Sequence, residues 1–504
     1  MDNARDLELL VASHHPIISI ESAEEERVET LLAEVAARLD LPLFTWRATR
    51  GLIRTGTHDP IYETDKPATA LKCAAAMQTD ALYLFHDLQR YFEDPVVLRS
   101  LRDIAAQFTV ARRALVLCAP ELPIPVDLRA SVAPFTLELP GPEDLKRMAV
   151  RTLRDLGAPK KVRIDLPVAD LERLIANLRG LTLQEAQRLL MRVALDDLKI
   201  DAEDLRRVQE HKKEILARDG VLTLHPDEAR LQQVGGLAAL KEWLRTRGAA
   251  FGPEAAKYGL EPPRGLLLIG VQGCGKSLTA RAVAAEWNVA LLQLEAGALF
   301  DKYIGESERN LRNALKTAEA MAPCVLWIDE VEKGFAARDS ATDGGLSRRL
   351  LGSLLTWLQE RKAPVFTMAT ANDVGTLPPE FLRKGRFDEI FFVDLPGDAA
   401  RRAIAAIHLS RRRQDPATFD LAALAAATEG YSGAEIEAVV VSALYAAFAA
   451  KAPLDDRHLR AAAASTVPLS RTCRESITAL REWARGRAVA ADGSAVTPAA
   501  RPAA

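Results

Sequence analysis

The sequence contains few cysteines, no long apolar run and almost no net charge. Its five cysteines among 504 residues show no C-x-x-C spacing, which argues against a disulfide framework or a zinc site and fits a reducing compartment. The longest apolar stretch, residues 438–450, is much shorter than the ~20 residues that a membrane helix needs. The net charge of −3 provides no global field that would attract nucleic acid or anionic lipid. The first residues lack the basic-then-apolar layout of a signal peptide, so we expect a cytoplasmic protein without a membrane span.

What the chain does contain is ample material for hydrophobic cores. Of its residues, 48% are hydrophobic and 27% are charged, values that are typical of globular proteins. The chain is too long for one ordinary core, so we expect about two to four domains.

The most informative segment, residues 270–277, reads Gly-Val-Gln-Gly-Cys-Gly-Lys-Ser. An apolar run at 265–269 precedes it and strong helix formers at 278–286 follow it, so the pattern is strand, glycine turn and helix. In this context G-x-x-x-x-G-K-[ST] is typical of a phosphate-binding loop, and the alternative is a chance glycine-rich turn. We expect Lys276 to reach the β- and γ-phosphates and Ser277 to bind Mg²⁺. The segment predicts a nucleoside triphosphate site whose contacts are Gly270, Gly273, Cys274, Gly275, Lys276, Ser277 and Leu278.

Two further predicted strands end in polar residues. The apolar run 324–328 is followed by Asp329 and Glu330. At the carboxyl edge of a parallel sheet, Asp329 is expected to hold the Mg²⁺ shell and Glu330 to orient and polarise the attacking water. The strand 364–372 ends in Asn372, whose amide would bind the γ-phosphate and the water together; the alternative is an Asn that caps a turn.

Two arginines flank a glycine in the segment 381–388. Arg383 and Arg386 stand on either side of Gly385, which predicts guanidinium groups that project from a tight loop. A permanently charged, forked guanidinium suits the charge that develops on a transferring phosphate. The alternative is a surface loop that only forms salt bridges.

The first 140 residues predict a separate, mostly parallel α/β domain. Its expected strands are residues 16–20, 43–46, 81–85, 114–118 and 135–140. Landmarks of this half recur later, because residues 135–144 resemble 391–398 and residues 180–186 resemble 430–436. We interpret these similarities as a diverged second copy of one fold, although any α/β domain can show some of them.

The first copy is predicted to be unable to hydrolyse ATP. Where a phosphate loop should follow its first strand, residues 21–26 contain no glycine and four carboxylates, which would repel a triphosphate. Its third strand is followed by one acid, Asp87. We expect this copy to act as a rigid platform for partners or for neighbouring subunits.

Together these motifs resemble the AAA ATPase family, in the branch that contains ring-shaped unfoldases and remodelling enzymes. The resemblance covers about residues 231–466 and includes, besides the motifs above, Val-Gly-Gly-Leu at 234–237, Lys-Tyr-Ile-Gly-Glu-Ser-Glu-Arg at 302–309 and Gly-Tyr-Ser-Gly-Ala-Glu at 430–435. The whole chain is similar to a cyanobacterial and plastid-type subgroup in which a degenerate ATPase-like half precedes the active one. The resemblance implies a P-loop α/β fold with a C-terminal helical lid, preceded by a degenerate AAA-like α/β domain.

The expected domain organisation combines the residue patterns with this resemblance. It comprises a degenerate α/β domain (1–140), a helical subdomain (141–200), a helical linker ending near Gly220 (201–230), the nucleotide-binding α/β domain (231–400), a helical lid (401–470) and a C-terminal helix with a disordered tail from residue 491 (471–504).

The resemblance also implies cofactors, partners and residue roles. It implies a homo-hexameric ring that uses ATP with Mg²⁺, in which Arg383 and Arg386 reach the nucleotide of the adjacent subunit. It assigns Asn372 as a nucleotide sensor and places His408 near the adenine, for which the alternative is a packed helix histidine. The other nucleotide contacts that it implies are Gly235, Gly433 and Ala434.

One exposed pair is expected to touch a substrate. In the resembling families, the aromatic-apolar pair that is Tyr303-Ile304 here lines the central pore and grips a threaded polypeptide. A tyrosine offers a large contact area at low entropic cost; the alternative is that Tyr303 packs locally. One segment departs from the family pattern, since residues 331–335 read Val-Glu-Lys-Gly-Phe where relatives often carry Ile-Asp and small residues.

The favoured function is ATP-driven remodelling or unfolding of a protein client, which the sequence does not identify. The alternative is an ATP-dependent regulatory switch or assembly scaffold that binds partners without threading them. A nucleic-acid motor is disfavoured, because residues 411–413 are the only compact basic run and no aromatic residues interleave with it.

Overall fold

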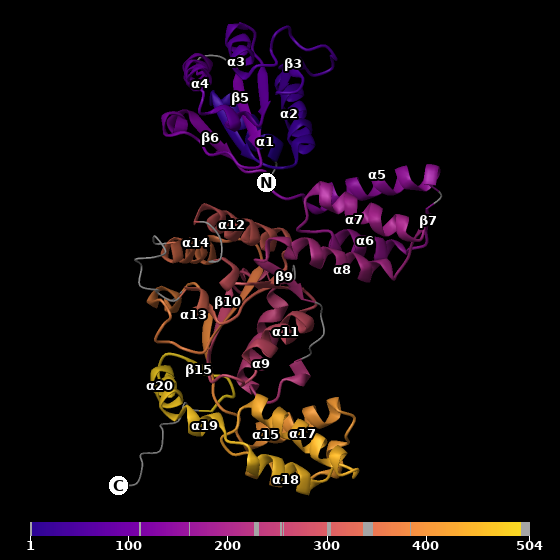
Figure 1. The fold of residues 1–504 in the computed structure, drawn as a ribbon, viewed down its shortest axis with the longest axis vertical. Helices are drawn as coiled ribbons and strands as arrows, with labels where there is room; N and C mark the ends of the chain where they lie inside the picture. Colours follow the sequence, from indigo (N-terminus) through magenta and orange to yellow (C-terminus); the bar gives the residue numbers. More distant parts are fainter. Residues whose placement is uncertain are drawn as a thin grey trace. The chain divides into compact units, whose positions relative to one another are not determined.

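The computed structural model describes residues 3–109, 112–160, 162–225, 231–251, 255, 257–299, 304–335, 346–383 and 385–494. They form two compact units, which are described one at a time below (Figure 1). The first unit comprises residues 1–164 and 181–199, and the second unit comprises residues 165–180 and 200–504.

The first unit is an α/β unit with additional helices. Its helices include α1 (Asn3–Ala12), α2 (Glu25–Leu39), α3 (Pro67–Ala76), α4 (Pro95–Phe108), α5 (Pro142–Lys160) and α7 (Leu183–Asp196). Its strands include β1 (Ile17–Glu21), β2 (Leu43–Arg47), β3 (Gly51–Arg54), β4 (Leu82–His86), β5 (Ala114–Ala119), β6 (Val132–Phe135) and β7 (Arg163–Ile164), and β8 (Lys199–Ile200) lies at the boundary with the second unit.

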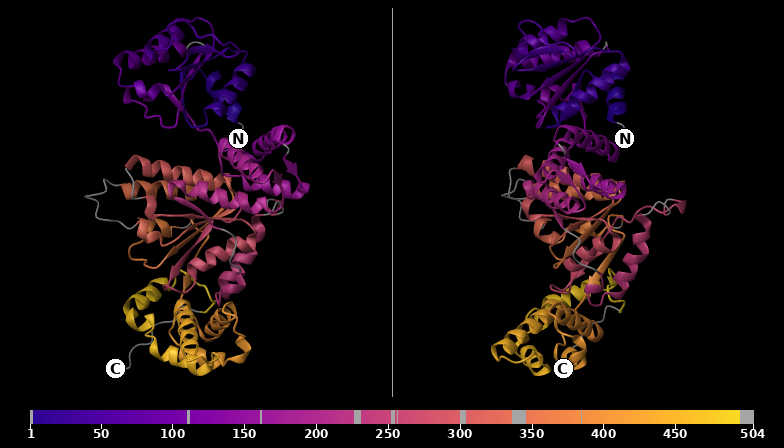
Figure 2. Two further views of the ribbon diagram at one scale, coloured as in Figure 1. Left: turned by 45° about the vertical axis from the view of Figure 1, so that its right-hand side comes forward. Right: turned by 90° about the vertical axis from the view of Figure 1, so that its right-hand side faces the viewer.

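A six-stranded sheet forms the centre of the first unit, in the order β3-β2-β4-β5-β1-β6. Neighbouring strands are parallel except β2 and β3. β4 and β5 are buried along their whole length, as expected of central strands that helices cover on both faces. α3 and α4 pack on one face, and α1 and α2 pack on the other (Figures 1 and 2).

The second unit combines a larger α/β sheet with two groups of helices. Its helices include α6 (Val168–Asn177), α8 (Asp204–Leu216), α9 (Ala238–Gly248), α11 (Lys276–Trp287), α12 (Ile304–Ala320), α13 (Val331–Phe335), α14 (Leu346–Glu360), α15 (Asp398–Arg411), α16 (Leu421–Ala427), α17 (Gly433–Ala449), α18 (Asp456–Ser465), α19 (Leu469–Thr472) and α20 (Arg474–Ala484). Its strands include β9 (Leu222–His225), β10 (Gly265–Gly270), β11 (Ala290–Leu294), β12 (Cys324–Ile328), β13 (Val365–Ala371), β14 (Glu389–Val393) and β15 (Val489–Ala490).

The sheet of the second unit has the order β15-β14-β10-β13-β12-β11-β9. Neighbouring strands are parallel except β11 and β9. α12 and α14 cover one face, whereas α9 and α11 cover the other (Figure 1). α15 to α18 bury a separate apolar core of their own and form a helical lid. The predicted α/β fold with a parallel sheet and a helical lid is confirmed.

The two sheets share one strand topology. If the two-residue edge strand β15 is left aside and the other parallel strands of each sheet are numbered in chain order, both sheets read 5-1-4-3-2. The order is β6-β1-β5-β4-β2 in the first unit and β14-β10-β13-β12-β11 in the second. The helical regions also share a local motif, because Thr182 and Glu185 form a reciprocal capping box at the start of α7, as Ser432 and Glu435 do at the start of α17. The prediction that the first half is a diverged copy of the same fold is therefore confirmed.

Two details of the first sheet differ from the sequence-based expectation. The fifth strand was expected at 135–140 but lies at Val132–Phe135. It pairs with β1 only as far as Phe135, and β1 ends one residue beyond that pair, so the following residues have no strand to pair with. Pro134 is tolerated because β6 lies at the sheet edge. The antiparallel edge strand β3 was not predicted.

The C-terminal segment also differs from the sequence-based expectation. Residues 491–494 were expected to begin a disordered tail, but Ala491 is buried, and its N–H donates a hydrogen bond to the carbonyl oxygen of Phe392 at 2.9 Å. The preceding two-residue strand β15 extends the sheet next to β14. Across the part of the chain that the structure describes, every helix is too short or too polar to span a bilayer.

Candidate nucleotide-binding site

The phosphate loop connects the central strand β10 to α11. β10 is fully buried and ends at Gly270, and α11 begins at Lys276. A Cβ on Gly270, whose φ is +153°, would lie 2.0 Å from the carbonyl oxygen of Val393 on the neighbouring strand, so only glycine fits there. Gly273 and Gly275 adopt left-handed φ values of +74° and +89°, which glycine reaches at little cost. The sequence therefore folds into a turn with backbone N–H groups free to face an anion.

Lys276 lies inside this loop. Its side chain is buried, and Nζ donates hydrogen bonds to the carbonyl oxygens of Gly270 at 2.7 Å and Val271 at 2.8 Å. Burial lowers the pKa of Lys276 to about 8, because a cation loses hydration in the interior. Its ammonium group is thus held at the position where a phosphate would approach the loop.

Ser277 and Asp329 lie side by side. The Ser277 hydroxyl donates to Asp329 Oδ1 at 3.0 Å. The Thr370 hydroxyl, from β13, donates to the same oxygen at 2.5 Å and accepts the backbone N–H of Glu330 at 2.9 Å. A hydroxyl and a carboxylate fit Mg²⁺, which favours oxygen ligands and keeps waters and substrate phosphates in its shell. Ser277 and Asp329 are therefore the residues that would hold this ion.

Glu330 and Asn372 also meet at this edge of the sheet. Asn372 Nδ2 donates a hydrogen bond to Glu330 Oε1 at 2.9 Å. Glu330 has a left-handed backbone with φ +47°, an uncommon conformation that is held by its bond to Thr370. The structure thus brings together Lys276, Ser277, Asp329, Glu330 and Asn372, as the motifs predicted.

Two charged residues at this site were not assigned a role from the sequence. Glu332 is buried, and its Oε1 accepts the backbone N–H of Asn372 at 2.9 Å. Burial raises the pKa of Glu332. Lys333 forms an ion pair with Oε2 of Glu330. Both residues stand in the segment where the sequence departs from the family pattern, and that departure was the available signal.

A pocket lies between the phosphate loop and the lid. Its lining comes from residues 235–237, Cys274, residues 394–397, Ala400, Ile404, Gly433 and Asp492. Gly235 is required there, since a Cβ on it would lie 2.4 Å from Ile404 Cγ1. The loop and the lid touch directly, because the N–H of Ala434 donates to the carbonyl oxygen of Gly273 at 3.0 Å. The predicted contacts Gly235, Cys274 and Gly433 therefore line one pocket, and Ala434 lies next to it.

The C-terminal segment contributes to this pocket, which sequence reasoning missed. Asp492 is part of the lining. Asp394, at the end of β14, forms a bidentate pair with Arg481 of α20, with Nε–Oδ2 at 2.8 Å and Nη2–Oδ1 at 2.9 Å. This pair fastens α20 beside the pocket. Such contacts join residues about a hundred positions apart, so local patterns carry no signal for them.

His408 lies on α15, one turn beyond the pocket residue Ile404. Its Nδ1 is 3.5 Å from Glu437 Oε1, and Glu437 also pairs with Arg412 at 2.8 Å. Burial lowers the pKa of His408. The pocket lining does not include His408.

The two candidate arginines differ in exposure. Arg383 is exposed and follows a short 3₁₀ turn at Pro379–Leu382. Arg386 is partly buried, and its Nη1 has no hydrogen-bond partner among the described residues. Gly385 between them has a left-handed φ of +95°. Neither arginine belongs to the pocket lining of the same chain.

The pore-loop prediction falls mostly outside the described residues. Tyr303 is one of the residues that the structure does not describe. Ile304 is the first residue of α12.

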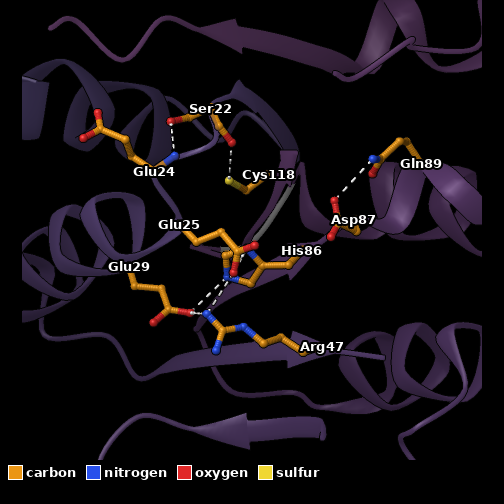
Figure 3. Close-up of polar contacts among 9 residues, drawn as sticks. All are labelled: Ser22, Glu24, Glu25, Glu29, Arg47, His86, Asp87, Gln89 and Cys118. Atoms are coloured by element: carbon orange, nitrogen blue, oxygen red, sulfur yellow. Dashed lines mark hydrogen bonds and ion pairs between the residues drawn. The ribbon is translucent and has the colours of Figure 1, made fainter. Parts of the chain in front are cut away.

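The first unit contains a counterpart of the nucleotide site that is filled by its own side chains (Figure 3). α2 begins at Glu25, where α11 begins at Lys276. β4 ends at His86 and is followed by Asp87 with φ +54°, just as β12 leads into Asp329 and then Glu330 with φ +47°. The signs of the charges are therefore exchanged, with an acid at the lysine position and a histidine at the aspartate position.

These groups pair with one another, although Arg47 Nε and His86 Nδ1 are buried without a hydrogen-bond partner among the described residues. His86 Nε2 lies 3.0 Å from Glu29 Oε1, and Arg47 Nη2 contacts Glu29 at 2.8 Å and Glu25 at 3.0 Å. The hydrogen bond with His86 lowers the pKa of Glu29, which keeps that carboxylate ionised. Figure 3 shows the four side chains converging from α2, β2 and β4. The cluster is a network of internal ion pairs where the second unit has an open phosphate loop.

Glu24 completes the counterpart site. Its side chain is mostly buried and pairs with Arg27 at 3.0 Å. Its Oε1 also accepts the backbone N–H of Leu183, the first residue of α7, at 2.8 Å. Each copy therefore links its strand-to-helix turn to the N-terminal end of a lid-type helix. The second unit uses the carbonyl oxygen of Gly273 for this link, whereas the first unit uses a carboxylate.

Comparisons with protein-family models match four segments of the chain. Residues 266–395 match "ATPase family associated with various cellular activities (AAA)", and residues 418–459 match "AAA+ lid domain". In the first half, residues 3–137 match "SpoVK-like AAA ATPase, N-terminal domain" and residues 143–219 match "SpoVK-like AAA ATPase, second domain".

Similar proteins extend over almost the whole chain. The AAA domain-containing protein ycf46 of Guillardia theta is 35% identical over 488 residues, which cover 96% of this chain and 95% of that protein. The protein of the same name from Pyropia yezoensis is 33% identical over 488 residues, which cover 96% and 98%. The Cell division cycle protein 48 homolog of Archaeoglobus fulgidus is 34% identical over 252 residues, which cover 49% of this chain and 34% of that protein.

Proposed function

This chain belongs to the AAA ATPase family, and on that premise we propose that it hydrolyses ATP to remodel or unfold protein clients as a hexameric ring. The observation that carries the proposal is the convergence of Lys276, Ser277, Asp329, Glu330 and Asn372 at one edge of the sheet. The pocket next to this edge, lined by Gly235, Cys274 and Gly433, supports a place for the nucleoside.

Each of these residues has a separate role in hydrolysis. Lys276 and the loop N–H groups bind the β- and γ-phosphates. Glu330 accepts the proton of the attacking water, and Asn372 positions the water against the γ-phosphate. Mg²⁺, when bound by Ser277 and Asp329, neutralises charge on the phosphates. The water oxygen forms a bond to the γ-phosphorus while the bond to ADP breaks, and the products are ADP and phosphate.

The ring is proposed because one chain does not complete this site. The charge that develops on the γ-phosphate calls for a guanidinium, and Arg383 is exposed outside the pocket of its own chain. In a ring, Arg383 and Arg386 would reach the nucleotide of the adjacent subunit. The closed point-group symmetry that most oligomers adopt supports such a repeated interface.

A mixing experiment tests this arrangement. Arg383→Ala chains lack the finger but keep the phosphate loop, and Lys276→Ala chains have the opposite defect. Each variant alone should have little ATPase activity, whereas mixtures should regain part of it, because a loop of one chain then meets a finger of the other. Equal mixtures of wild type and Lys276→Ala serve as the dilution control. Mixtures that stay inactive at every ratio, although the variants co-assemble, would refute fingers acting between subunits.

The second candidate function is a regulatory switch or assembly scaffold that binds partners without threading them. The counterpart site favours it, because its acids are paired with groups of the same unit, and a unit whose ion pairs form without a nucleotide is suited to hold a partner. Tyr303→Ala separates the two functions. Threading requires that this variant keep basal ATP hydrolysis and lose processing of a client, whereas a switch requires that both remain.

The role of the first unit and the location of the protein complete the proposal. We assign the first unit as a platform that recruits partners without a nucleotide cycle of its own. The chain is proposed to act in the cytoplasm, and its near-neutral net charge argues against nucleic acid as a partner.

A further inference from the structure

Both carboxylate oxygens of Glu330 are engaged by donors. Oε1 accepts a hydrogen bond from the side-chain amide of Asn372 at 2.9 Å, and Oε2 forms an ion pair with Nζ of Lys333. The Glu330 side chain is 29% exposed, so water can reach it. A general base needs a free oxygen within hydrogen-bond reach of the water whose proton it takes. In this arrangement each oxygen of the base already holds one donor, so only the second acceptor site of each oxygen is open to a water.

The two donors are not equivalent. During catalysis the Asn372 amide has other acceptors than Glu330, because its proposed role is to contact the γ-phosphate and the attacking water. Lys333 lies on α13, three residues beyond Glu330, and its side chain reaches back to Glu330, which precedes the helix with a φ of +47°. No role in phosphate binding is assigned to it, and its only described ion-pair partner is Glu330.

The backbone around this pair is firmly held. Glu330 donates its N–H to Thr370 Oγ1 at 2.9 Å, and its carbonyl oxygen accepts the N–H of Lys333 at 2.8 Å. Glu332, between them, is buried and accepts the N–H of Asn372. The ion pair therefore forms between side chains whose backbones have little freedom to separate, and only the Lys333 side chain, which is 69% exposed, can swing away.

We propose that Lys333 is a positioning residue that restrains Glu330 and slows ATP hydrolysis until its ammonium group is drawn away. The proposal rests on the hydrolysis assigned to this site. It adds an inhibition that acts on the general base Glu330 and not on nucleotide binding. Anything that offers Lys333 another anion, such as an acidic group of an adjacent subunit, would release the base.

The test compares Lys333→Met with Lys333→Arg in the full chain at saturating Mg·ATP. Exposed ion pairs are worth up to roughly 1 kcal/mol, so kcat should rise about twofold to fivefold in Lys333→Met. KM should stay within about twofold of wild type, because the phosphate contacts are intact. Lys333→Arg retains the cation and should keep kcat near the wild-type value. Arg457→Met removes an exposed pair with Asp455 on α18 in the lid and controls for the loss of any surface charge.

Two further readouts separate a charge effect from a structural one. The ratio of kcat between Lys333→Met and wild type should fall toward one as salt rises, since salt screens an exposed pair. The kcat of Lys333→Arg should keep the salt dependence of the wild type, because this variant retains the cation.

Each outcome either supports or overturns the restraint of Glu330 by Lys333. Equal or lower kcat in Lys333→Met at low salt would overturn the restraint, as would a Lys333→Arg chain that is activated to the same degree. A wild-type chain without ATPase activity would contradict the proposed function itself. In that case, activity that appears only in Lys333→Met would still support the restraint, and a variant that is equally inactive would overturn it too.

Discussion

The buried lysine of the phosphate loop predicts that nucleotide affinity falls at alkaline pH. Lys276 Nζ donates to two carbonyl oxygens inside the loop, and burial lowers the pKa of Lys276 to about 8. A phosphate needs the ammonium form, and its negative charge raises the pKa of the lysine again in the complex. Binding above pH 8 must therefore take up a proton, which costs free energy.

The size of the effect follows from the fraction of free protein with a charged lysine. With a pKa of about 8, this fraction is about 0.9 at pH 7 and about 0.1 at pH 9, so the apparent Kd should weaken about tenfold, or about 1.4 kcal/mol. Below pH 7 the curve should flatten, because Lys276 is then already charged. Burial raises the pKa of the neighbouring Cys274 to about 12, so its thiol stays neutral over this range and does not contribute.

The assay is equilibrium binding of a fluorescent, non-hydrolysable ATP analogue between pH 7.5 and 9.5, where the γ-phosphate is fully ionised. Calorimetry in buffers of different ionisation enthalpy should show proton uptake that grows with pH. Lys276→Arg is the control, since a guanidinium does not deprotonate in this range; its affinity should be lower but independent of pH. A wild-type Kd that is constant from pH 7.5 to 9.5 would refute the argument that burial controls the charge of this lysine.

Three other predictions concern the same site. Glu330→Gln should retain ATP and form stable assemblies while kcat falls about 10²–10⁴-fold, the range for loss of a general base; turnover at the wild-type rate would remove Glu330 from its role. Equilibrium dialysis should give one nucleotide per chain, and Lys276→Ala should abolish it, because Glu24, Glu25 and Glu29 fill the counterpart site of the first unit; a second nucleotide would contradict this. Gly235→Ala should cost about 1–3 kcal/mol of ATP affinity or stability, because its Cβ would meet Ile404 Cγ1 at 2.4 Å. Adding Ile404→Ala should recover part of that loss, and strictly additive losses would show that the clash is not the cause.

The parts of the site that short motifs describe were predictable from the sequence. The phosphate loop, Asp329 with Glu330, and Asn372 each follow a buried parallel strand, and the carboxyl ends of such strands meet at one sheet edge. The distances between Ser277 and Asp329 and between Asn372 and Glu330 result from this topology. The family assignment rested on the same motifs and is confirmed by the family models and the full-length relatives.

The remaining features depend on contacts that the local sequence does not encode. β15 has two residues, too few for any periodicity, and it is ordered by pairing with β14. Asp492 reaches the pocket for the same reason. β6 was misplaced because its extent depends on its pairing with β1, which ends at Phe135 opposite Ile20, and not on its own apolar pattern. The pair of Glu330 with Lys333 is different, because an acid and a lysine three residues apart at a helix start are visible in the sequence.

The two copies of the fold show what a strand-to-helix turn requires with and without a ligand. In the second unit the turn presents backbone N–H groups and Lys276, which are donors for an anionic ligand. In the first unit the chain supplies the anions itself, as Glu24, Glu25 and Glu29, and therefore also supplies their donors: His86, Arg47, Arg27 and the N–H of Leu183. Reversing one charge would not restore nucleotide binding there, because the remaining acids would still repel a phosphate and the turn would still lack glycine. A site whose acids are already paired within the unit has no bound nucleotide to respond to, which is the property that a fixed platform needs.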